Sequence, residues 1–136
     1  MVEKILLVDD DSRIHVHVGQ FVTRFNDLKK KNLELIGVYS IKDAQSAVLK
    51  EAKSIKLVLQ DGELNQAQNS LHASMEFISR AVPALPGARF VAISLADTNN
   101  EYLIGAGCHE ALAKSELVKG GPLLRLLNKI FNNDQP

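Results

Sequence analysis

The sequence predicts a doubly wound α/β fold, in which five parallel strands form one sheet with helices on both faces. Two observations lead to it. Short, continuous runs of branched apolar residues recur along the chain, as in strands buried on both faces. Segments with helical spacing of apolar residues separate these runs, and such alternation with short connections requires parallel strands and right-handed crossovers. The 136 residues are enough for one domain, because most domains contain roughly 100–150 residues.

The predicted strands share a short apolar core bounded by charged or turn residues. They lie at 4–8, 34–38, 56–60, 89–95 and 110–113, and the last of these has the weakest pattern. Each is followed by a predicted helical segment, so the chain alternates strand and helix five times, and in the first segment the apolar residues recur at intervals of three, four and seven.

The predicted helices are delimited by capping residues and helix breakers. The first carries Ile14, Val18 and Phe25 on one face, and the others span 41–52, 71–82, 97–106 and 122–131. Ser40 is a suitable N-cap for the second helix, since its hydroxyl can accept a free backbone N–H. The Pro83–Gly87 segment should end the third helix, and Gly107 should cap the fourth. The polar connection 62–70 is long for a strand-to-helix loop, which usually has about 2–6 residues.

The composition excludes several classes of protein. Sixteen basic residues balance sixteen acidic ones, so no global field favours nucleic acid. No apolar run approaches the roughly 20 residues of a membrane span, and the first apolar run is too short for a secretory signal. We therefore expect a cytoplasmic protein that binds neither nucleic acid nor membrane. Cys108 is the only cysteine, so no internal disulfide is possible, and we expect a reduced, partly buried thiol.

Polar residues follow the apolar runs where each strand should end. Asp9, Asp10 and Asp11 follow the first strand and Asp61 follows the third, while a hydroxyl (Ser94) and an ammonium (Lys114) come near the ends of the last two. The carboxyl ends of parallel strands lie at one edge of a sheet, where ligands of this fold class bind. Taken singly, these residues also suit a helix cap, a turn or a solvated charge; together they predict one acidic site.

Several carboxylates in one cleft repel each other, and a cation relieves that repulsion. Ligands that are all oxygen, with no nearby His or Cys, suit Mg²⁺, which keeps some of its waters and takes only one or two carboxylates directly. A phosphoryl oxygen could occupy another coordination position, with Lys114 and the Ser94 hydroxyl binding further oxygens.

Four runs resemble the receiver domain of bacterial two-component response regulators, in the same order and at similar spacing. They are KILLVDDD (4–11), IKLVLQD (55–61), FVAIS (90–94) and GCHEALAK (107–114). The resemblance covers about residues 4–131, so it implies a single receiver domain over 1–136 with the flavodoxin-like receiver fold and no output domain. It implies phosphorelay signal transduction: a phosphoprotein that takes its phosphoryl group from a histidine kinase or phosphotransfer protein and signals by binding an unidentified downstream protein.

The resemblance also assigns a role to each site residue. Asp61 is the phosphoacceptor, Ser94 the switch hydroxyl and Lys114 the phosphoryl-binding lysine. The Mg²⁺ ligands are Asp10, Asp9 mainly through water, Asp61, and the backbone carbonyl of Glu63. Such a domain catalyses only its own Mg²⁺-dependent phosphorylation and dephosphorylation, and is not an enzyme acting on an outside substrate.

Three departures from the family pattern point to an unconventional output. Ala111 stands where the switch aromatic belongs, Ser115 replaces the proline after the lysine, and Asn65 replaces a proline in a loop with about five extra residues. These departures favour one alternative, a phosphorylation-independent pseudo-receiver that acts as an interaction module. Tyr102 could substitute for the missing aromatic, although packing in the core or on the surface is the simpler expectation.

A second alternative is a small phosphatase with an Asp nucleophile. Asp9-x-Asp11 after an apolar strand resembles the motif of haloacid-dehalogenase-like enzymes, with Asp9 as nucleophile and Asp11 as general acid. Arg13 departs from that pattern, and the chain is short for that family. The four histidines form no chelating pair at i, i+4 spacing, and we expect His15 and His17 to have surface roles.

Overall fold

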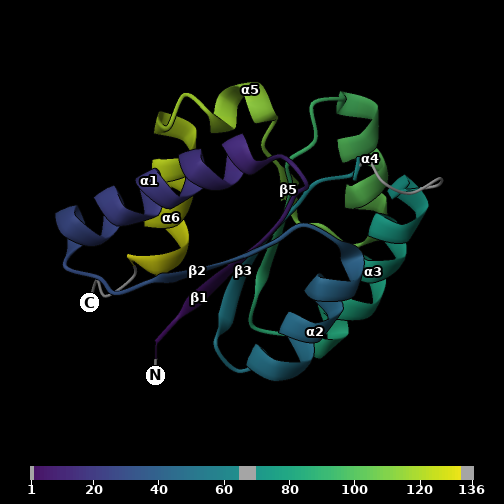
Figure 1. Cartoon of the computed structure of the whole chain (residues 1–136), viewed down its shortest axis with the longest axis horizontal. Helices are drawn as coiled ribbons and strands as arrows, with labels where there is room; N and C mark the ends of the chain where they lie inside the picture. Colours follow the sequence, from purple (N-terminus) through teal and green to yellow (C-terminus); the bar gives the residue numbers. More distant parts are fainter. Residues whose placement is uncertain (1, 65–69, 133–136) are drawn as a thin grey trace.

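The computed structural model describes residues 2–64 and 70–132. Its five strands form one parallel sheet in the order β2-β1-β3-β4-β5 (Figure 1), which confirms the predicted fold class. The strands are β1 (Lys4–Val8), β2 (Glu34–Val38), β3 (Ile55–Gln60), β4 (Arg89–Ala92) and β5 (Glu110–Ala111).

Helices cover both faces of this sheet (Figure 1). They are α1 (Ser12–Lys29), α2 (Ile41–Glu51), α3 (Ser70–Ala84), α4 (Asp97–Ala106), α5 (Lys114–Leu117) and α6 (Gly121–Phe131). α1, α5 and α6 lie on one side and α2, α3 and α4 on the other. Within the described residues, no helix combines the length and apolar character needed to cross a membrane.

The two apolar layers follow from the alternation of side chains along each strand. In β1, Ile5 and Leu7 pack toward α1 and α6, whereas Leu6 and Val8 pack toward α2 and α3, and all four are fully buried. Each such side chain contributes about 1.5–3 kcal/mol when buried. Apolar packing therefore holds the central strands on both faces, and the residues that directly follow these strands start from a well-fixed backbone.

The ends of the helices match the capping residues in the sequence. Asp11 caps α1 by accepting the N–H of Arg13 at 2.9 Å, and Ser40 caps α2 by accepting the N–H of Asp43 at 3.2 Å. Gly107 ends α4 with φ of 135°, a conformation that an L side chain rarely adopts. Because Asp11 is the N-cap of α1, this helix begins directly after the acidic segment that follows β1.

Several elements differ from the prediction, among them β5, which ends at Ala111 and not at residue 113. β4 ends at Ala92, not at residue 95, because its neighbour β5 has only two residues to pair with it. α3 continues past Pro83 to Ala84, and the buried Leu85 still donates its N–H to Ala81. The short α5 was not predicted, and it begins at Lys114. Much of the long polar connection, 65–69 with Asn65, lies outside the described residues.

Candidate functional site

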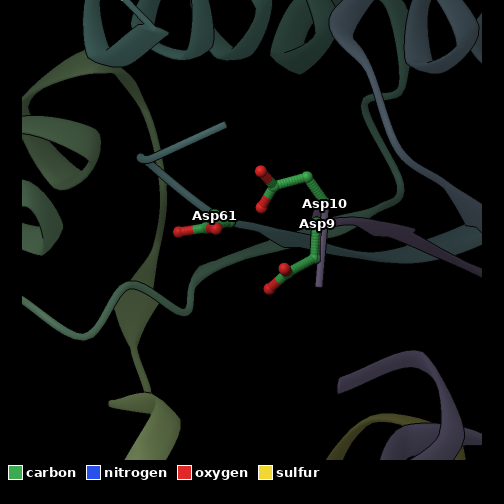
Figure 2. A group of neighbouring side chains, drawn as sticks. All are labelled: Asp9, Asp10 and Asp61. Carbon is green, nitrogen blue, oxygen red and sulfur yellow. The ribbon is translucent and has the colours of Figure 1, made fainter. Parts of the chain in front are cut away.

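Three aspartates meet at the carboxyl ends of the two central strands. Asp9 and Asp10 follow β1 and Asp61 follows the adjacent β3, and oxygens from the three lie within 4.8 Å of one another. Figure 2 shows their carboxyl groups on the same side of the strand ends, with Asp10 above and Asp9 below Asp61. Asp9 is 0% and Asp61 1% exposed, whereas Asp10 is partly exposed. The strand order reverses between β1 and β3, which is where ligands bind in sheets of this kind.

The backbone holds the two buried aspartates by extending the sheet one residue past each strand. The N–H of Asp9 donates to Val38 at 3.1 Å, and the N–H of Asp61 donates to Val8 at 2.9 Å. The carbonyl of Asp61 accepts from two buried side chains, Gln60 Nε2 at 2.9 Å and Ser74 Oγ at 3.2 Å. Asp61 therefore presents its carboxyl group from a fixed main chain.

Lys114 lies between the two buried carboxylates. Its Nζ is 2.9 Å from Asp61 Oδ2 and 3.0 Å from Asp9 Oδ2, and its side chain is 11% exposed. The ammonium directs its hydrogen bond to Asp61. Asp9 Oδ1 accepts the N–H of Asp11 at 2.8 Å, but Asp9 Oδ2 is buried and receives no aligned hydrogen bond from the described residues. This oxygen is thus available to another cation.

The site has more carboxyl groups than positive charges to balance them. Burial raises the pKa of Asp61 to about 6, and the Asp9 carboxylate adds to the rise, while Lys114 and the N–H of Glu63 oppose it. Burial likewise raises the pKa of Asp9. Burial works against the charge of Lys114, yet its hydrogen bond to Asp61 and the neighbouring charges of Asp61 and Asp9 raise its pKa. One ammonium does not offset three neighbouring carboxyl groups, so a divalent cation would stabilise their ionised forms.

The residues present fit Mg²⁺. The donors are carboxylate oxygens only, within the spacing that a single ion requires, and one of them is a buried oxygen without an aligned hydrogen bond. Magnesium favours such ligands and keeps waters at its remaining positions. The arrangement brings together Asp9, Asp10 and Asp61, as the sequence predicted.

Glu63 lies beside this group but in a different relation to it. Its N–H donates to Asp61 Oδ1 at 3.1 Å, which matches a turn after the acidic residue. Its exposed side chain accepts a 2.6 Å hydrogen bond from Asn99 on α4. A link between the acidic loop and α4 was not predicted, because no local pattern joins residues so far apart. The role of the Glu63 carbonyl as a metal ligand stays a prediction.

Ser94 follows β4 at the same rim and is 1% exposed. The side chain of Asn100 binds both backbone groups of Ser94. The Ser94 N–H donates to Asn100 Oδ1 at 2.8 Å, and Asn100 Nδ2 donates to the Ser94 carbonyl at 3.1 Å. The Ser94 hydroxyl accepts a long contact of 3.5 Å from Asn99. Asn100 thus binds both backbone groups of Ser94, two residues beyond the end of β4.

The β5 side of the rim carries two of the three departures from the family pattern, Ala111 and Ser115. Ala111 is exposed, and the Lys114–Ser115 bond is trans, since the described residues contain no cis peptide bond. Tyr102 lies at the surface of α4 with 56% exposure. Of the two environments expected for it, core or surface, the structure shows the surface. A cavity of about 390 Å³ lies beside Lys114, bounded by α1, α5 and the exposed Leu95.

Two histidines have structural partners. The expected surface role of His15 is wrong: its Nε2 is 2.7 Å from the Asp9 carbonyl, and its ring stacks on Tyr39. His109 accepts the N–H of Phe90 through Nδ1 at 3.0 Å. No pattern in the sequence predicts either contact, because each depends on how separate elements pack. Cys108 is more deeply buried than the partly buried thiol that we expected, and burial raises its pKa to about 12.

The fold and the site together define a class: a doubly wound α/β protein with an acidic, cation-binding pocket at the point where the strand order reverses. No protein-family model matches the sequence, and no curated protein matches it. The fold itself is the receiver fold, since structural neighbours across the full chain are response regulator receiver domains.

Three solved structures illustrate the similarity. A response regulator from Thermotoga maritima has a TM-score of 0.74 at 16% identity, covering 98% of this chain and 100% of its own. A response regulator receiver domain protein from Clostridium thermocellum has a TM-score of 0.73 at 20% identity, covering 96% and 95%. A response regulator in its Mn²⁺-bound form has a TM-score of 0.66 at 15% identity, covering 98% and 97%. At these identities the comparison establishes the fold.

Proposed function

We propose that this protein accepts a phosphoryl group on Asp61 from a histidine kinase or phosphotransfer protein, and signals by binding another protein. One observation carries the proposal: the buried Asp61 carboxylate lies 2.9 Å from Lys114 Nζ, in a group with Asp9 and Asp10 that fits a divalent cation. A carboxylate, an ammonium and a cation site are the groups that phosphoryl transfer requires. The solved neighbours, one of them with Mn²⁺ bound, support the same function.

In the proposed reaction, an oxygen of the Asp61 carboxylate attacks the phosphorus of a phosphohistidine. The new P–O bond forms as the P–N bond breaks, and the imidazole leaves with the electron pair and takes a proton from solvent. The Lys114 ammonium and the Ser94 hydroxyl would bind oxygens of the transferred group. Bound Mg²⁺ would neutralise charge on the phosphoryl oxygens, held by Asp10, Asp61 and Asp9 with the Glu63 carbonyl.

The test is phosphorylation by a small donor. We expect incubation with acetyl phosphate and Mg²⁺ to add the mass of one phosphoryl group to the intact protein, and chelation of Mg²⁺ to prevent it. Asp61→Asn should abolish the gain. Asp11→Asn is the matched control, since Asp11 caps α1 and pairs with Arg13 at 2.9 Å, and it should still gain phosphate.

Absence of any gain by the wild type would contradict the proposal and leave the pseudo-receiver interaction module as the better function. The exposed Ala111 and the α5 helix beginning at Lys114 favour that alternative. The phosphatase alternative is disfavoured, because Asp11 is engaged with Arg13 and Asp9 is fully buried beside Lys114. Turnover of a phosphomonoester that Asp9→Ala abolishes and Asp61→Ala preserves would support it. The cytoplasmic location and the absence of a fused output domain stay predictions.

A further inference from the structure

We propose that His15 is a positioning residue for the acidic site, which holds the peptide between Asp9 and Asp10 so that both carboxylates face the cation. The inference rests on the proposed function in one respect, the binding of Mg²⁺ by these aspartates. Three observations support it independently: a hydrogen bond, a glycine that leaves room for the imidazole, and an aromatic stack.

The hydrogen bond joins His15 Nε2 to the carbonyl oxygen of Asp9 at 2.7 Å. A carbonyl oxygen only accepts, so Nε2 carries the proton. The N–H of Asp9 is bound to Val38 at 3.1 Å, which fixes the peptide before Asp9. His15 therefore fixes the peptide after it, and together the two contacts determine the direction of the chain through the acidic pair.

Gly37 provides the space for this imidazole. A Cβ at Gly37 would lie 2.5 Å from His15 Nδ1 and 3.0 Å from Cε1, and its φ lies outside the left-handed region. The backbone of β2 therefore does not require glycine there, whereas the imidazole does. Gly37 is exposed on an edge strand, so the surroundings of β2 do not otherwise restrict the residue at this position.

Tyr39 holds the imidazole ring from another side. The two ring centroids are 4.1 Å apart with an interplanar angle of 19°, an arrangement that restricts rotation of the imidazole. Tyr39 is 47% exposed, which shows that this ring packs on the imidazole rather than in the apolar core. Residues of α1 and of the end of β2 thus hold the His15 imidazole in the orientation in which its Nε2–H meets the Asp9 carbonyl.

The support acts on the carboxylates because the carbonyl of Asp9 belongs to the Asp9–Asp10 peptide. Rotation of that peptide plane would turn the Cα–Cβ bond of Asp10 relative to Asp9. Figure 2 shows the carboxyl group of Asp10 above Asp61 and that of Asp9 below it. Groups outside the ligand set that orient ligands commonly change metal affinity by about 10–100-fold when removed.

The experiment measures Mg²⁺ binding to the unphosphorylated full chain by isothermal titration calorimetry. We expect His15→Ala to weaken Mg²⁺ binding about tenfold. His15→Gln should recover most of the affinity, because its side-chain N–H lies the same number of bonds from Cα as His Nε2. Gly37→Ala should weaken binding by displacing the imidazole. His17→Ala, a partly buried histidine on the same helix, is the control and should bind Mg²⁺ as the wild type does.

Thermal unfolding of each variant shows whether it is folded, and if His15→Ala does not fold, Gly37→Ala and His15→Gln carry the test. Wild-type affinity in folded His15→Ala or Gly37→Ala would overturn the inference, as would a folded His15→Gln that binds as weakly as His15→Ala. Lack of Mg²⁺ binding by the wild type would also overturn it. A wild type that binds Mg²⁺ but gains no phosphate would contradict the proposed function alone.

Discussion

The rim of the sheet consists of two unlike halves, one on the central strands β1 and β3 and the other on β4 and β5. β1 pairs with each of its neighbours along five residues, whereas β4 and β5 pair along only two. The central half carries Asp9, Asp10 and Asp61. The other half carries Ser94, and Lys114 follows it at the start of α5.

The two halves of the rim differ in how their site residues are held. Next to the central strands, the acidic residues are held through backbone N–H and carbonyl groups on both sides. Beyond β4 and β5, a side chain (Asn100) supplies the hydrogen bonds that a strand would supply, Leu95 is 73% exposed, and Ala111 stands where an aromatic is expected. The central half thus holds its three carboxyl groups on a fixed backbone, whereas the other half departs from the receiver pattern at Ala111.

The largest predicted effect lies in the central half. Asp61→Asn should stabilise the metal-free protein at pH 7.5 by about 3 kcal/mol, the value of a pKa raised from 3.8 to about 6. Between these values the folded state binds more protons than the unfolded state. The contribution of Asp61 to stability is therefore greatest below about pH 4 and is lost as pH rises through about 6. Urea unfolding against pH measures both effects.

Asp11→Asn provides the contrasting control for that measurement. The side-chain hydrogen bond from Arg13 lowers the pKa of Asp11, so removal of its charge should not stabilise the protein at pH 7.5. Equal or lower stability of Asp61→Asn at this pH would show that Lys114 already compensates the buried charge, and the contrast between the two halves would then concern packing alone.

An intermediate effect is expected at β4. Asn100→Ala should destabilise the protein by about 2 kcal/mol, because it leaves the buried N–H and carbonyl of Ser94 without partners. Asn99→Ala is the matched control, since Asn99 is partly exposed and its bond to Glu63 lies at the surface. Urea unfolding at neutral pH compares them. If the two halves are independent, Asn100→Ala keeps wild-type Mg²⁺ affinity in calorimetry; a marked loss would show that they are coupled.

The smallest effect is expected at β5. Ala111→Tyr places a ring on an exposed position, so the stability change should stay within about 0.5 kcal/mol. The rate of phosphate gain from acetyl phosphate should stay within about twofold of wild type, because the altered residue is not among the groups around Asp61. A strong change in that rate, followed by intact mass over time, would mean that Ala111 acts on the acceptor half.

The features that the sequence predicted are those encoded within single segments. The continuous apolar runs around Leu6 and Val58 identified the buried strands, and parallel strands bring residues that follow them to one rim. For that reason Asp9, Asp10, Asp61 and Lys114 were found from spacing and resemblance together. The N-cap at Ser40 and the glycine at Gly107 were likewise visible locally.

The features that the sequence did not predict depend on contacts between distant segments. His15 looked like a surface residue because its partners, the Asp9 carbonyl and Tyr39, become neighbours only when α1 packs on β2. The end of β4 depends on how few residues β5 pairs with it. The bond between Glu63 and Asn99 requires α4 to lie beside the loop after β3. No periodicity or motif encodes such distances.

Lys114, whose Nζ contacts both Asp61 and Asp9, has a consequence for synthesis on the ribosome. A nascent chain that has emerged only through β4 already contains the three aspartates but not the ammonium that lies between two of them. The pocket is therefore complete only after β5 has joined the sheet and Lys114, at the start of α5, is in place. If Asp61 accepts a phosphoryl group as proposed, a chain that stops before Lys114 would lack the ammonium expected to bind that group.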